Sequence, residues 1–541
     1  MSEQQLIRGT MILTASIFIS KMLGLIYIFP FTAIVGHDGI ALYSYGYTPY
    51  TVMLSLATLG VPLAVSKFVS KYNALGDYRT GQRLLKSGLI IMTITGIFAF
   101  LALFFLAEPI ANQVLDPDSL EGNSISDAVF TIRMVSVALI VVPIMALIRG
   151  YFQGHQSMGP TAISQVVEQI IRIIFILTLT YIIIELMGGE LGIAVGFATF
   201  GAFVGALGGL AVLLYYWKKR WIGLQKQIEQ STVDHQIPLP KMYKELFAYA
   251  IPISLVGLSI PLYQTVDLLT FNEAMRNAGF TQSVYETYYA AFTQTSHKLI
   301  LIPVAVATAM SLTILPTVTS AFINNETDRL QRTITQTYQI IFFLTIPAAI
   351  GLMLLAEPSY AALFGLEEVA IGSDILRSYA PIAVAFSIFA VTSSLLQGIN
   401  KQKYAVIALI AGLLFKTVFN AILISFFAAQ GAVLATGIGY LIAISVNIWA
   451  IGKYAEYNYS FMIKRFLLIS LFAAIMGAVV AFLNYGFQQM IPINSRLDAI
   501  LILAVTILSG AVVYMNISIR SGLAGQILGH RFDFLKKNEN N

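Results

Sequence analysis

The sequence predicts an all-α polytopic membrane protein with about 14 transmembrane helices, arranged as two pseudo-symmetric six-helix lobes plus two C-terminal helices. Hydrophobic residues make up 57% of the 541 residues and charged residues only 11%, whereas a soluble domain carries about 25% charge. Its apolar runs reach the roughly 20 residues that a membrane-spanning helix needs. They are too long for barrel strands of about 10 alternating residues. A third observation, an internal repeat, predicts the two lobes.

Fourteen apolar segments are long enough to span the membrane. The first, residues 11–36, is almost wholly apolar and contains a single lysine, Lys21. The second and eighth are the least regular, because glycine and proline interrupt them or lie near their ends. The predicted spans lie near 10–35, 41–66, 87–107, 128–150, 160–185, 191–217, 245–271, 284–318, 335–356, 377–397, 404–428, 431–452, 464–486 and 497–518.

Charge alternates between successive loops, which predicts the orientation in the membrane. The loop after the second span is basic, and the loop after the third contains only acidic charges. The loop after the sixth span is again basic, and the loop after the ninth is acidic. By the positive-inside rule, both termini are expected in the cytoplasm. The net charge of +5 is therefore a topology signal and does not indicate nucleic-acid binding.

Two parts of the chain repeat one another. Residues 132–154 align with 376–398 at a constant offset of 244, which pairs Arg133 with Arg377 and, further along, Arg172 with Lys416. The tetrapeptide Leu-Ala-Glu-Pro also occurs twice, at 106–109 and 355–358. The copies are six spans apart and so share an orientation, as in several transporter folds. The predicted parts are an N-terminal lobe 1–220, a cytoplasmic linker 221–243, a C-terminal lobe 244–453, a two-helix segment 454–519 and a cytoplasmic tail 520–541.

Charged residues inside the predicted spans mark candidate functional positions. Lys21 lies about 15 Å into the first span, where a charge costs about 2.5–3.5 kcal/mol and usually faces a bundle interior or a watery cavity. Glu168 and Arg172 are four residues apart and can pair on one helix face. That pair is either a functional site or a self-neutralising structural contact. Arg149 is interpreted as a turn and membrane-edge anchor.

The C-terminal lobe has its own polar positions. Ser296, His297 and Lys298 follow three further polar residues and form a face too wide for lipid exposure. Lys416 lies one turn before Asn420. Asp267 closes the seventh span, the first of this lobe.

Lys21 and Lys298 belong to different predicted lobes. If both line a central cleft, they form a cationic pocket suited to a phosphate or pyrophosphate. His297 is either a hydrogen-bond donor with a pH response or a polar wall residue. The sequence has no cysteine, which excludes disulfides and thiolate metal sites, and its five histidines lack metal-ligand spacing. It has no GxxxxGK[ST] motif for nucleotide binding.

Several motifs carry a family resemblance: Ser20-Lys21-Met22-Leu23-Gly24, Gly60-Val61-Pro62 with the residues up to Lys67, and Arg149-Gly150-Tyr151-Phe152-Gln153-Gly154. The sequence resembles the polysaccharide-exporter branch of the MOP flippase superfamily. It is most similar to the MurJ-type lipid II flippases of Gram-positive bacteria and their sporulation relatives. The resemblance covers nearly the whole chain and implies a MOP/MATE-like fold.

The resemblance implies an alternating-access transporter of the bacterial plasma membrane, not an enzyme. It would carry the undecaprenyl-pyrophosphate-linked peptidoglycan precursor lipid II from the inner to the outer leaflet, with no cofactor. Ser20 and Lys21 match a family cavity position, and His297 and Lys298 fall about where some members have an Asp-Arg pair. The implied partners are the lipid-linked glycan, membrane lipids and the cell-wall synthesis machinery.

The resemblance also implies a coupling ion in some members, held between an acid on span seven and polar groups on span eleven. Asp267 and Asn420 are weak sodium candidates here, and the nearby Lys416 argues against an intact site. Membrane potential and protons are the alternatives. Other functions remain open: a flippase for another undecaprenyl-linked glycan, such as a capsule or teichoic-acid precursor, or a MATE-type multidrug antiporter. The deep charges are largely basic, which disfavours the antiporter.

Overall fold

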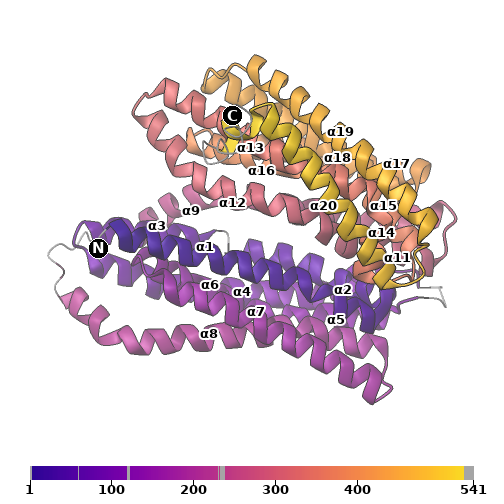
Figure 1. Ribbon diagram of the computed structural model, residues 1–541. Helices are drawn as coiled ribbons and strands as arrows, with labels where there is room; N and C mark the ends of the chain where they lie inside the picture. The colour runs from indigo at the N-terminus through magenta and orange to yellow at the C-terminus, as the bar shows by residue number, and fades with distance from the viewer. Residues whose placement is uncertain (1–2, 59, 118–121, 230, 232–237, 529–541) are drawn as a thin grey trace. The chain divides into compact units, whose positions relative to one another are not determined.

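Helices joined by turns and short loops make up the part of the protein described by the structure, a computed structural model covering residues 3–58, 60–117, 122–229, 231 and 238–528. The chain divides into two compact units, Met1–Glu273 (unit 1) and Ala274–Asn541 (unit 2). Figure 1 shows the helices of each unit packed side by side in long bundles. The predicted all-α membrane fold is confirmed.

The described part of unit 1 contains nine helices, one π-helical turn and most of a tenth helix, α10, whose last residues belong to unit 2. They are α1 Glu3–Ile26, α2 Ile28–Thr58, α3 Val61–Ala74, α4 Tyr78–Val114, α5 Ile125–Ser136, α6 Ala138–Gly154, α7 Met158–Tyr181, η1 Ile182–Leu186, α8 Leu191–Glu229, α9 Leu239–Gly257 and α10 Ser259–Asn277.

Unit 2 contains the remaining helices and a second π-helical turn. They are α11 Gln282–Ala290, η2 Ala291–Thr295, α12 Ser296–Ile323, α13 Thr327–Leu354, α14 Ala356–Phe364, α15 Val369–Tyr379, α16 Ile382–Gly398, α17 Gln402–Phe427, α18 Ala429–Tyr454, α19 Ser460–Met490, α20 Arg496–Arg520 and α21 Leu523–Leu528.

Local sequence explains several helix ends. Asp77 caps α4 by accepting a hydrogen bond from the Thr80 backbone N–H at 2.9 Å, as N-cap carboxylates commonly do. Gly36 interrupts α2 with a φ of 66°, a left-handed conformation that glycine adopts without a Cβ clash. Gly60, at φ 68°, precedes α3. The second predicted span, 41–66, is therefore wrong at its end, because the chain turns at Gly60 and starts a separate helix.

Ten helices in the described part are long and apolar enough to cross a membrane, or up to twelve if each of two bent pairs is one span. This is fewer than the fourteen predicted. The first two predicted spans fall in one continuous candidate membrane span, Ala15–Thr58. The reason is that the chain stays apolar between α1 and α2 and across the interruption at Gly36. The predicted eighth span is divided among α11, η2 and α12 and is not among the ten.

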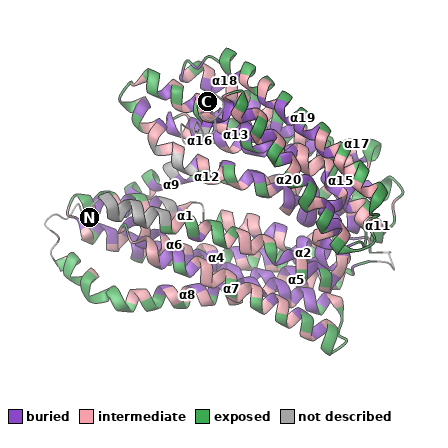
Figure 2. Ribbon diagram, in the orientation of Figure 1, coloured by how far each residue is buried: buried purple, intermediate pink, exposed green. Residues whose placement is uncertain are grey.

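Large apolar side chains are exposed on many of the helices. Figure 2 shows exposed positions along the outer helices. Phe98, Phe105, Phe426 and Phe482 each expose more than 70% of their surface. A soluble protein rarely exposes a continuous apolar surface, whereas lipid tails accept one. The chain is therefore a multi-pass membrane protein.

Along the chain, the boundary between the two units falls between Glu273 and Ala274. The predicted C-terminal lobe starts earlier, at residue 244. The boundary lies later because α9 packs on unit 1: its Met242, Leu246 and Ala250 lie in one apolar cluster with residues of α3, α4 and α6. The predicted linker 221–243 begins inside α8, and residues 230 and 232–237 lie outside the described residues. Of the predicted tail, α21 is described and residues 529–541 are not.

The internal repeat is visible in the helix boundaries of the two units. Shifted by 244 residues, α6 coincides with α16 at both ends, and the first residue of α7 coincides with that of α17. The residue that turns the chain between these helices has the same left-handed conformation in both copies, with φ 56° at Gln156 and 57° at Asn400. The two units thus repeat one helical design, as the sequence predicted.

Candidate functional site

Ser20 and Lys21 lie on α1, which packs along α7 in unit 1. Gly24 allows close contact, because a Cβ there would lie 3.2 Å from Gln169 Nε2 of α7. Ser20 is one turn before Gly24 on the same face, and its Oγ has no hydrogen-bond partner in the described part of the chain. The Lys21 side chain is exposed on the surface of unit 1.

Glu168 and Arg172 form the predicted ion pair on α7, with Arg172 Nη2 2.6 Å from Glu168 Oε1. Arg149 of α6 completes a three-charge cluster, because its Nη2 lies 2.9 Å from Glu168 Oε2. The same guanidinium donates to Ser164 Oγ at 2.7 Å, and Ser164 donates to the carbonyl of Gly209 on α8 at 2.8 Å. The interpretation of Arg149 as a mere edge anchor is therefore wrong. Its position one helix away from Glu168 is a tertiary fact that spacing does not show.

A row of tyrosines on α2 lies near this cluster, and sequence reasoning missed it. Tyr43 stacks on Tyr47 with ring centroids 5.2 Å apart, and Tyr47 contacts Tyr50 at 5.5 Å. The hydroxyl groups of all three lie near the Arg172 guanidinium. Their spacing of four and three residues is the signal that could have revealed one helix face.

The polar segment predicted around Ser296 is buried in unit 2. Thr293, Gln294 and Thr295 lie in the π-helical turn η2, and all three are buried. Such turns are rare and frequently occur at functional sites. The Ser296 hydroxyl donates to the Gly372 carbonyl at 3.0 Å. The expectation that this face avoids lipid is confirmed.

His297 and Lys298 differ in their surroundings. His297 is buried, and its Nδ1 lies 2.9 Å from the Tyr379 hydroxyl, with the two rings stacked at 5.8 Å. The Phe386 ring contacts the imidazole edge-on, with ring centroids 6.2 Å apart. Lys298 is half-buried. Within unit 2, the histidine is thus part of an aromatic cluster, while the lysine retains access to the surface.

Lys416 is fully buried on α17. Its ammonium donates to the Thr436 hydroxyl of α18 and lies 5.6 Å from the centre of the Phe292 ring of η2. Asn420, one turn later, is also fully buried. Asp267 of α10 is buried in unit 1. No group of three or more His, Cys, Asp or Glu side chains within the described ranges could hold a metal ion.

These features define a class: a helical membrane protein whose bundles carry buried and half-buried cations. Its fold matches that of two solved membrane proteins. A solved structure titled "Lipid II flippase MurJ, inward closed conformation" matches with a TM-score of 0.67, 17% identity, and coverage of 96% of this chain and 99% of that one. An inward-facing MATE family multidrug resistance transporter matches with a TM-score of 0.66, 15% identity, and coverage of 81% and 95%.

Sequence comparison identifies the family. A family model described as "Polysaccharide biosynthesis protein" matches residues 6–322, and one described as "Lipid II flippase MurJ" matches residues 275–500. The lipid II flippase MurJ of Bacillus subtilis (strain 168) is 44% identical over 532 residues, covering 98% of each chain. The chain belongs to the MurJ family, and the predicted resemblance is confirmed.

Proposed function

We propose that the protein is a flippase that moves lipid II, the undecaprenyl-pyrophosphate-linked peptidoglycan precursor, from the inner to the outer leaflet by alternating access. The observation that carries this proposal is the 44% identity to the Bacillus subtilis lipid II flippase over 98% of both chains. The shared fold supports transport rather than catalysis as the activity. A role in cell-wall synthesis and cell shape follows from the substrate, and the synthesis machinery is a proposed partner.

The lysines of the two units support an anionic substrate. Lys21 is exposed on α1, and Lys298 is half-buried on α12. Within its own unit, each lacks a carboxylate partner among the described residues. A fixed ammonium without a carboxylate attracts phosphate. We therefore assign both to pyrophosphate binding, with Ser20 and His297 as neighbouring polar groups.

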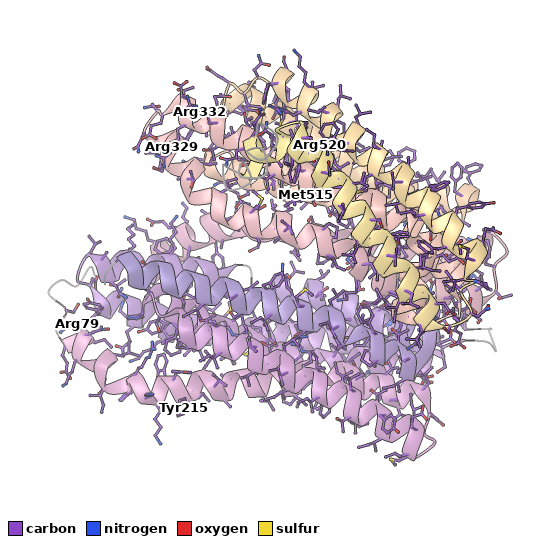
Figure 3. The ribbon with its side chains drawn as sticks, in the orientation of Figure 1. Arg79, Tyr215, Arg329, Arg332, Met515 and Arg520 are labelled. Atoms are coloured by element: carbon purple, nitrogen blue, oxygen red, sulfur yellow. The ribbon has the colours of Figure 1, made fainter. Side chains whose placement is uncertain are left out.

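The same proposal places the protein in the bacterial plasma membrane with both termini in the cytoplasm. The N-terminus and Arg79 lie at the same end of unit 1 (Figures 1 and 3). Lys71 in the last turn of α3 and Arg83 near the start of α4 belong to this end as well, because α3 ends at Ala74 and α4 begins at Tyr78. A positive end of this kind faces the cytoplasm under the positive-inside rule.

For coupling, we propose membrane potential or protons rather than sodium. Lys416 lies one turn from Asn420 and holds a fixed positive charge in the interior of unit 2. A sodium ion coordinated by Asn420 would be repelled at that separation. Uptake of lipid II analogues into vesicles with and without a sodium gradient tests this assignment.

Complementation of a strain depleted of its lipid II flippase tests the function. The wild-type chain should restore growth, and Lys21→Ala and Lys298→Ala should lose this ability at unchanged membrane abundance. Arg133→Gln is a matched control, because Arg133 lies over the Phe104 ring at 4.9 Å, outside the assigned positions. No rescue by well-expressed wild type would favour another undecaprenyl-linked glycan. Rescue by both alanine variants would remove the lysines from the site.

A further inference from the structure

The cluster of Arg149, Glu168 and Arg172 in unit 1 carries an excess positive charge. Two guanidiniums share one carboxylate, at 2.9 and 2.6 Å. The three side chains expose only 12–15% of their surface. Their other recorded partners, Ser164 and the tyrosines of α2, are neutral hydroxyls. The cluster therefore has a net charge of +1.

This charge lies well inside the membrane-spanning part of the chain. Glu168 and Arg172 follow Met158, the first residue of their span, by about 15 and 21 Å of helix. An uncompensated charge at such depth is costly, and charged residues there usually mark a substrate or ion pathway. An anion that reaches the cluster would compensate the excess charge.

The repeat shows that the fold does not require this cluster. At the offset of 244 residues, Arg149 corresponds to Ser393 and Glu168 to Gly412, while Arg172 corresponds to the cation Lys416. Unit 2 nevertheless forms the same helices, with α6 matched by α16 at both ends. A brace needed to hold α6 against α7 would be expected in both copies. Arg149 and Glu168 thus have no charged counterpart in unit 2 at this offset.

The geometry leaves hydrogen-bonding capacity for a ligand. Glu168 holds Arg172 through Nη2 alone, and Arg172 Nε is buried without a hydrogen-bond partner among the described residues. A guanidinium binds phosphate oxygens through two parallel N–H groups. Half-buried Tyr47 lies within electrostatic range of the same guanidinium and presents a further hydroxyl group.

We propose that Arg149, Glu168 and Arg172 form an anion-binding subsite in unit 1 that takes a phosphate group of a lipid. Arg172 contacts the phosphate, Arg149 adds a second positive charge, and Glu168 bridges the two guanidiniums and offsets one of their charges. This subsite does not include Lys21 and deepens the proposed function, on which it rests for the identity of its lipid. The phosphate belongs either to the pyrophosphate of the transported substrate or to a phospholipid headgroup.

Binding to the purified full-length protein in detergent tests the proposal. Inorganic pyrophosphate and short-chain phosphatidylglycerol are the two probes, and binding is measured by isothermal titration at constant ionic strength. Arg172→Gln should weaken binding of at least one probe about tenfold, as expected for a lost charge-assisted contact. Preference for pyrophosphate identifies the substrate headgroup, and preference for phosphatidylglycerol identifies a phospholipid. Arg133→Gln, another arginine of unit 1, should bind as wild type.

Glu168→Gln separates anion binding from structural damage. It keeps both arginines and raises the net charge of the cluster from +1 to +2, so it should bind the favoured probe several-fold more tightly. Wild-type affinity for both probes in Arg172→Gln, or weaker binding in a folded Glu168→Gln, would overturn the proposal. The proposed function has a separate test, because an incorrect function would leave the wild-type chain unable to complement the flippase-depleted strain. The binding measurements on the purified protein do not depend on the result of complementation.

Discussion

The close packing of α3 on α6 gives a prediction that depends on a single methyl group. Gly150 of α6 lies against the backbone of Pro62, and a Cβ at this position would be 2.2 Å from the Pro62 carbonyl oxygen and 2.9 Å from its carbonyl carbon. Both neighbours are backbone atoms, so no side chain can rotate away. Gly150→Ala must instead push the start of α3 away from α6 by about 1 Å, an overpacking shift.

The cost follows from two opposing effects. Overpacking a tight contact costs about 1–3 kcal/mol, and replacing glycine by alanine inside a helix gains about 1 kcal/mol. Because the clash is with backbone, we take the upper part of the range and expect a net loss of about 2 kcal/mol in unfolding free energy. Thermal unfolding of the detergent-purified protein should show a lowered midpoint for Gly150→Ala.

Gly159→Ala is the matched control, because a Cβ at Gly159 in α7 meets nothing within 4 Å. It should be neutral or stabilising by up to about 1 kcal/mol, from helix propensity alone. If Gly150→Ala were as stable as Gly159→Ala, the close approach of α3 and α6 would be refuted. If both variants were destabilised equally, the loss would not come from the Pro62 contact.

Two further predictions concern the ends of helices outside the spans. Burial lowers the pKa of His155 to about 4 from its ordinary 6.5, so its contribution to stability is fully present above pH 6.5 and is lost as the pH falls toward 4. Wild type should lose up to about 3 kcal/mol across that window. The Asn73 side-chain amide lies 3.2 Å from His155 Nδ1, and His155→Gln, which keeps a partner for that amide, should lose measurably less in pH-dependent unfolding. Asp77 accepts hydrogen bonds from both the backbone N–H and the hydroxyl of Thr80 at the start of α4. Asp77→Ala should therefore destabilise the protein by about 1–2 kcal/mol, and Asp77→Asn by less. Equal midpoints of thermal unfolding for the two variants would contradict a capping role.

The sequence by itself determined the class of the protein and much of its plan. Hydropathy and run length are local properties, so they identify membrane helices without any knowledge of packing. The offset of 244 residues located the repeat, and the structure places the ends of α6 and α16 in that register. The spacing of Glu168 and Arg172 fixed their pairing, because residues four apart share a helix face.

Only the tertiary structure decided which side chains on different helices meet. Arg149 joins Glu168 because α6 packs beside α7, and His297 bonds to Tyr379 because α15 packs beside α12. Nothing in the local sequence of either residue encodes its partner. Helix periodicity sets the direction in which a side chain points. The packing of whole helices against one another decides which residues that side chain contacts.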